Sequence, residues 1–129
     1  MIRPFDIATE VVGGVGVVRV SGDLDGAESP TLRLALISTA QSTSGVVIDL
    51  SECEFIGSSG IAVIVEAWRG LDGRRPENLV LAAPNGQVDR IIRVAGLDAV
   101  IAIFDRVDEA LASLASGEPE PSPTEKRAS

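Results

Sequence analysis

One continuous stretch decides the fold: residues 46–68, which read VVIDLSECEFIGSSGIAVIVEAW. Residues 46–50 are apolar apart from one aspartate, a pattern typical of a strand buried on both faces of a parallel sheet. The β-branched side chains of residues 61–68 favour a strand, but the length of the segment and the stop at Gly70 favour a buried helix. A buried strand followed by a buried helix is the repeating unit of α/β proteins.

The segments on either side alternate in the same way. We predict strands at residues 7–12, 15–20, 79–83 and 99–104, the first two pairing across two glycines. Helices are predicted at Ser29, where a capping side chain precedes a proline, at Asn85 and after Asp105, and Gly96 is expected to end the second of these in the left-handed conformation. The predicted fold class is α/β, with a mixed, largely parallel sheet of four to five strands packed with about four helices.

The length of 129 residues fits one compact domain, which we place at residues 4–116. Residues 117–129 contain three prolines and almost nothing apolar, so we expect a disordered tail rich in Pro, Glu and Ser. The first residues lack the features of a signal peptide, and the longest apolar run, residues 61–65, is too short to cross a bilayer. We therefore expect a cytoplasmic protein without membrane insertion.

Several amino-acid types are absent or rare. The chain has no histidine or tyrosine, one cysteine (Cys53) and one lysine (Lys126, in the expected tail). This composition excludes histidine-dependent nucleophiles, histidine metal sites and cysteine zinc clusters, so we expect no catalytic residues, no cofactor and no metal. A net charge of −8 with only four aromatic residues argues against binding to nucleic acid. Cys53 is expected to be a small packing residue.

The loop of residues 57–60, Gly-Ser-Ser-Gly, lies between the buried strand and the buried helix. Loops of this kind gather at the functional edge of an α/β sheet. In one interpretation, one serine simply caps the helix and Gly60 allows close packing. In the other, one serine caps the helix and the second is exposed, and the N–H groups and positive dipole of the helix start favour a negative group such as a phosphoryl group.

The same stretch resembles the core signature of the STAS domain, the family of anti-sigma factor antagonists and related modules. That signature is an apolar strand, Asp-Leu-Ser, a Phe-Ile pair and then Asp-Ser-Ser-Gly. Three further pieces are similar to the family in the right order: VRVSGDLD at 18–25, LAAPNGQVDRIIRVAGLD at 81–98 and FDRVDEAL at 104–111. The resemblance covers residues 5–115 and implies a single STAS-like domain.

The resemblance also implies a function and a site. Family members of the antagonist type bind an anti-sigma factor serine kinase and so free a sigma factor. The kinase phosphorylates the first serine of the pair, and a serine phosphatase reverses the modification. In this chain the implied acceptor is Ser58, with Ser59 as its neighbour, the helix cap and a less favoured acceptor. The implied surround of the phosphorylation site, which also contacts the partner, consists of Asp23, Asp25, Gly57, Ser59 and Gly60.

One departure from the family pattern keeps an alternative open. Gly57 stands where the family usually has aspartate, which removes an acidic group and is expected to make the loop more flexible. The alternative is a STAS module that binds without switching, such as a scaffold or accessory subunit in a stress-signalling or lipid-transport complex. An enzyme based on carboxylates is disfavoured, because the acidic residues show no clustering of the kind that metals need.

Overall fold

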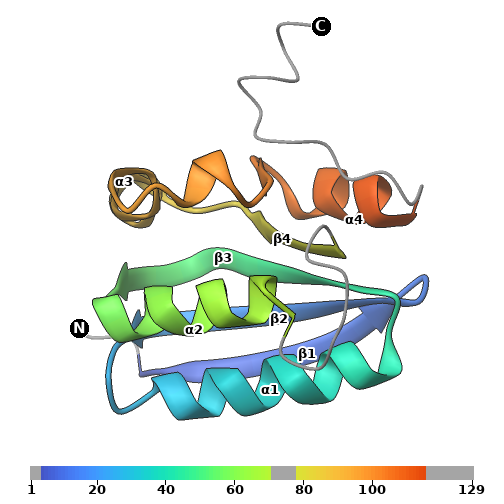
Figure 1. The fold of residues 1–129 in the computed structure, drawn as a ribbon, viewed down its shortest axis with the longest axis horizontal. Coiled ribbons are helices and arrows are strands. Elements are labelled where there is room, and N and C mark those ends of the chain that lie inside the picture. Colours follow the sequence, from blue (N-terminus) through green and yellow to red (C-terminus); the bar gives the residue numbers. More distant parts are fainter. Residues whose placement is uncertain (1–3, 71–77, 116–129) are drawn as a thin grey trace, which may run out of the picture.

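The sheet carries five strands in the part of the chain that the computed structural model describes, residues 4–70 and 78–115. The strands are β1 (Asp6–Val12), β2 (Val15–Leu24), β3 (Gly45–Ile56), β4 (Leu79–Ala82) and β5 (Ile103–Phe104), side by side in that order (Figure 1). β1 is antiparallel to β2, and the remaining neighbours are parallel. The predicted mixed, largely parallel sheet is confirmed, whereas the expected tail at 117–129 lies outside the described residues.

Helices cover both faces of the sheet and create two cores. α1 (Ser29–Ser42), α2 (Ser58–Trp68) and α3 (Gly86–Val94) pack on the face that holds the main core, and Figure 1 shows α1 and α2 lying side by side. α4 (Val107–Ala115) covers a smaller core on the opposite face. β2, β3 and β4 are parallel to one another and are followed by α1, α2 and α3. All three helices therefore begin at the carboxyl end of these strands.

β3 is central to both cores. Val46, Ile48 and Leu50 belong to the main core, and Val47 belongs to the smaller one, as the run of apolar residues predicts. Asp49, only 2% exposed, forms an ion pair with Arg19 of β2 at 2.9 Å, and its other oxygen accepts the N–H of Ser51. The Asp49 carboxylate raises the pKa of the Arg19 guanidinium further above its already high value. The buried carboxylate is thus paired and hydrogen-bonded, as burial of a charge requires.

The ambiguous stretch after β3 is a helix, as its length and the glycine stop indicate. β3 runs beyond its predicted end to Ile56, so Cys53 lies inside the strand and not after it. The last strand is shorter than predicted: Gly96 takes the expected left-handed φ of 84°, but residues 97–99 form a 3-10 turn, η2 (Leu97–Ala99). Backbone hydrogen bonds within that turn leave only two residues to pair with β4.

The start of α1 differs from its prediction in one respect. Pro30 lies in the first turn as expected, but Glu28 holds the N-cap position and Ser29 is already helical. The hydroxyl of Ser29 donates to the main-chain oxygen of Asp25 at 2.9 Å, so it secures the preceding turn and does not cap the helix. Among the described residues, no helix has the length and apolar character needed to cross a membrane.

Candidate functional site

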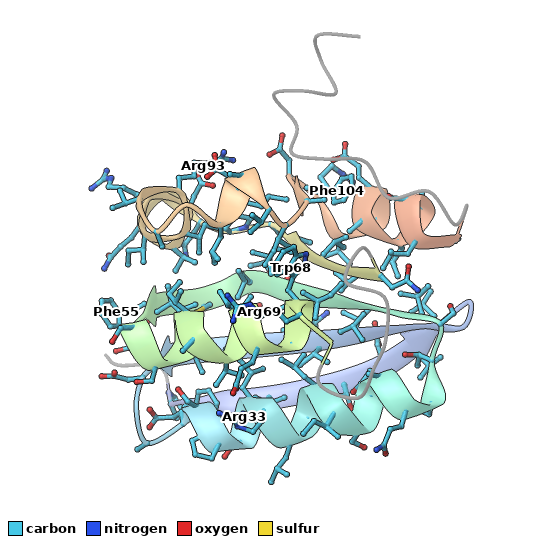
Figure 2. All side chains as sticks on the ribbon, viewed as in Figure 1. Arg33, Phe55, Trp68, Arg69, Arg93 and Phe104 are labelled. Atoms are coloured by element: carbon cyan, nitrogen blue, oxygen red, sulfur yellow. The ribbon has the colours of Figure 1, made fainter. Side chains whose placement is uncertain are left out.

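The candidate site forms where β2 and β3 end together. Leu24 and Ile56 are partners in the parallel ladder, and the N–H of Gly57 continues it by donating to the Leu24 oxygen at 2.8 Å. Asp25 and Gly57 are therefore the first residues beyond two neighbouring strands. Phe55, half-buried, lies at this end of β3 beside the start of α2 (Figure 2). Asp25 and Gly57, 32 positions apart in the sequence, thus meet at the carboxyl edge of the sheet, because the strands before them pair in parallel.

The start of α2 exposes a hydroxyl group. Gly57 is the N-cap residue, and no side chain in the described part of the chain caps the helix. Ser58 is exposed and Ser59 is half-buried, as the first and second helical residues. The expectation that Ser59 caps the helix is therefore wrong, because a capping side chain must belong to the residue that precedes the first helical one.

Gly60 is required by packing. A Cβ at this position would lie 2.7 Å from Leu24 Cγ and 3.1 Å from Ile56 Cγ1. Real Cβ atoms do not approach other atoms to 2.7 Å, so a larger residue would push α2 away from the ends of β2 and β3. This close approach is what places the first turn of α2, with Ser58, directly on the edge of the sheet.

The backbone conformation at position 57 does not require a glycine. Its φ of −91° and ψ of 177° are extended values that any residue adopts. A Cβ at Gly57 would instead lie 2.7 Å from Asp25 Oδ1. The Asp25 carboxylate occupies the space that a side chain at position 57 would need.

The turn after β2 is organised around Asp25. Its Oδ1 accepts the N–H of Gly26 at 2.8 Å. Its main-chain oxygen accepts the N–H groups of Glu28 and Ser29, both at 3.0 Å, together with the Ser29 hydroxyl. The Asp25 side chain thus lies against the start of α2, and its main-chain oxygen accepts the hydrogen bonds that precede α1.

Other acidic residues surround this edge. Asp23, exposed, is the ladder partner of Phe55, and Glu52 and Glu54 are exposed on β3. Asp23 and Glu54 are close enough to contribute to the raised pKa of the Cys53 thiol, although burial is the main cause of its rise to about 11. Cys53 is fully buried and its thiol donates to the Phe55 oxygen at 3.4 Å, so it is a neutral packing residue at pH 7.

Two features of this region were not predicted from the sequence: a second hydrogen bond of Asn85 and a groove. As expected, Asn85 caps α3, since its Oδ1 accepts the Val88 N–H at 3.1 Å. Its Nδ2 also donates to the Cys53 oxygen of β3. In addition, a groove of about 550 Å³ runs between α1 and α2 and adjoins the site. It is lined by Gly26, Ser29, Pro30, Arg33, Ser59, Ala62, Val63, Val65, Glu66 and Arg69.

The groove is lined by positively and negatively charged side chains. Arg33 of α1 forms an ion pair with Glu66 of α2. Arg69, the C-cap residue of α2, also lines the groove, and Figure 2 labels Arg33 and Arg69. Residues 33 and 66 are brought together only by the packing of α1 against α2, so no local sequence pattern indicates the groove. No group of three or more histidine, cysteine or acidic side chains that could hold a metal ion occurs among the described residues.

Relatives of known description share this architecture. The chain is 29% identical over 103 residues to the anti-sigma F factor antagonist of Paenibacillus polymyxa, covering 78% of this chain and 87% of that one. A crystal structure of an anti-sigma factor antagonist from Mycobacterium paratuberculosis has a TM-score of 0.77 and 31% identity, over 85% of this chain and 93% of the other. The phosphorylated form of the Bacillus cell fate determinant SpoIIAA has the same fold, with a TM-score of 0.60 and 18% identity over 86% and 99% of the two chains.

The sequence model of the STAS domain matches residues 6–110, from β1 into α4. This range contains all five described strands and the three helix starts that meet at the carboxyl edge. The fold and the family signature in the sequence agree with the match. The chain therefore belongs to the STAS domain family.

Proposed function

We propose that this protein is an anti-sigma factor antagonist that binds a serine-kinase anti-sigma factor and thereby frees a sigma factor. Its relatives from Paenibacillus polymyxa and Mycobacterium paratuberculosis carry the antagonist description and align over most of their lengths. The observation that carries the proposal is the exposed hydroxyl of Ser58 in the first turn of α2, at an edge formed by two loops. The function places the protein in the cytoplasm, where sigma factors act.

The proposed switch is phosphorylation of Ser58. The Ser58 Oγ attacks the γ-phosphorus of ATP held by the kinase, the hydroxyl proton is lost, and ADP leaves. The product carries a charge of roughly −1.5 to −2 at the start of a helix, where the dipole stabilises an anion by about 0.3–1 kcal/mol. The fold therefore tolerates the modified residue, and SpoIIAA, which shares the fold, has been solved in a phosphorylated form. A serine phosphatase would restore the hydroxyl group.

The effect of the switch follows from charge and desolvation. A phosphoryl group on Ser58 adds bulk and negative charge to a surface that already carries Asp23, Asp25, Glu52 and Glu54. Burying that group against a partner requires its desolvation, and the neighbouring carboxylates add repulsion. A penalty of about 3–4 kcal/mol weakens binding by roughly 100- to 1000-fold. We infer that the unmodified protein binds the anti-sigma factor and the phosphorylated protein does not.

The experiment combines intact-mass measurement with binding. The full chain is incubated with ATP and a purified serine-kinase anti-sigma factor, and one phosphoryl group is expected on the wild type and on Ser59→Ala, but none on Ser58→Ala. Binding is then measured by calorimetry for the wild type, Ser58→Ala and Ser58→Asp, with at least a 100-fold loss expected only for Ser58→Asp (about 2.8 kcal/mol).

Two results would overturn the proposal. Phosphoryl addition that persists in Ser58→Ala would assign the acceptor to another residue. Stable binding with no addition to any variant would instead favour a STAS module that binds without switching.

A further inference from the structure

The glycine at position 57 has a steric cause in the turn that follows β2. Its φ of −91° is open to every L-residue, so conformation does not demand glycine. A Cβ added there would meet Asp25 Oδ1 at 2.7 Å and Asp25 Cγ at 3.4 Å. The Asp25 carboxylate therefore lies in the side-chain space of the residue that immediately precedes Ser58.

The position of this carboxylate is tied to the backbone that begins α1. Asp25 Oδ1 accepts the N–H of Gly26, and the Asp25 main-chain oxygen accepts the N–H groups of Glu28 and Ser29 and the hydroxyl of Ser29. The side chain is short, with only two rotatable bonds between its backbone and its charge. The Gly26 N–H holds the rotamer that keeps the carboxylate at position 57, so moving the carboxylate away breaks a hydrogen bond of this turn.

We propose that Asp25 is a positioning residue that couples the state of Ser58 to the start of α1. The inference rests on the proposed phosphorylation of Ser58. A phosphoryl group on Ser58 places new negative charge beside a carboxylate that already fills the space of residue 57. Repulsion displaces Asp25 and weakens the hydrogen bonds that its main-chain oxygen accepts at the start of α1. Phosphorylation thereby alters the α1 side of the groove as well as the acceptor itself.

A double-mutant cycle tests the contact between Asp25 and Gly57. Thermal unfolding is measured for the wild type, Gly57→Ala, Asp25→Ala and the double variant. Gly57→Ala is expected to lower Tm by about 4–8 °C, and by clearly less when Asp25 has been replaced. Gly26→Ala is the matched control, since a Cβ there meets Ser59 Oγ at an ordinary 3.6 Å. Equal losses from Gly57→Ala in both backgrounds would overturn the contact.

Hydrogen exchange tests the coupling itself. The amides of Glu28 and Ser29 report the bonds to Asp25, and they are expected to exchange several-fold faster in Ser58→Asp than in the neutral, similarly sized Ser58→Asn. The difference should shrink as salt is raised and vanish when Asp25→Ala is added, because it arises from repulsion between two charges. A merely structural role of Asp25 would not produce this charge and salt dependence. Equal exchange in Ser58→Asp and Ser58→Asn would overturn the proposal.

Neither measurement uses a kinase, so the two proposals fail separately. Absence of phosphorylation with the purified kinase would count against the proposed function while leaving these exchange rates as they are. An absent coupling would leave phosphorylation of Ser58 and its effect on binding intact.

Discussion

The helices α2 and α3 begin at the same edge of the sheet but are built differently. At α3, Asn85 accepts the N–H of Val88 and donates to the Cys53 oxygen of β3. At α2, within the described residues, no side chain caps the helix, and Gly57 and exposed Ser58 take the first positions. The comparison teaches that the start of α3 is secured for stability, whereas the start of α2 keeps a hydroxyl group accessible.

The largest expected effect comes from the glycine in the first turn of α2. Gly60→Ala places a Cβ 2.7 Å from Leu24 Cγ and is expected to lower the free energy of unfolding by about 2–3 kcal/mol, as overpacking does. Urea unfolding of the full chain measures this loss. If Gly60→Ala were as stable as the wild type, close packing would not hold α2 against the strand ends.

The matched control lies in the first turn of α3. Gly86 is the first residue of that helix. Apart from its chain neighbours and its own helix backbone, an added Cβ would meet no atom of the described residues within 4 Å. Gly86→Ala is expected to be neutral or to stabilise by up to about 1 kcal/mol, since alanine is the better helix former.

A second prediction concerns Cys53 of β3, the strand that leads into α2 and that Asn85 bonds at the start of α3. Burial raises the pKa of its thiol from 9.0 to about 11. Well below pH 9 the thiol is neutral in both states. As pH rises through 9 toward 11, the thiol of the unfolded chain ionises first, so stability is progressively lost. The expected loss is about 2 kcal/mol by pH 11, measured by urea unfolding at pH 8, 9, 10 and 11.

Cys53→Ala is the control for this pH dependence. The variant should lose stability at pH 8 through its smaller side chain but should lack the extra decline between pH 9 and 11. The comparison is clean because the chain has no tyrosine and a single lysine, the other groups that titrate in this range. The same decline in wild type and Cys53→Ala would contradict the assignment to Cys53.

The smallest effect tests the contrast between the two helix starts directly. Asn85→Ala removes a cap and is expected to cost about 1–2 kcal/mol of unfolding free energy. Ser58→Ala and Ser59→Ala, which remove no cap, should each stay within about 0.5 kcal/mol of the wild type. Thermal or urea unfolding of the three variants measures these differences. A loss of about 1 kcal/mol of unfolding free energy in either serine variant would restore the interpretation of a capping serine.

The features that could be predicted depend on local patterns. Consecutive apolar residues identified β3 as a strand buried on both faces, and Asn85 and Gly96 marked the start and end of α3. The predicted extent of β5 and the predicted N-cap of α1 were wrong, because hydrogen bonds in the adjoining turns set those boundaries. The STAS signature was readable because four motifs occur in order along the sequence, and the family match confirms it.

The sequence by itself determined the α/β class, the family and the presence of two serines where a strand is followed by a helix. Only the tertiary structure decided which residue begins α2 and why residues 57 and 60 are glycines. Both answers depend on Asp25 and Leu24, which lie more than 30 positions away in the sequence and reach the site through the parallel pairing of β2 with β3. Local propensity cannot report such a contact, since the atoms that fill the space of each missing side chain belong to another strand end.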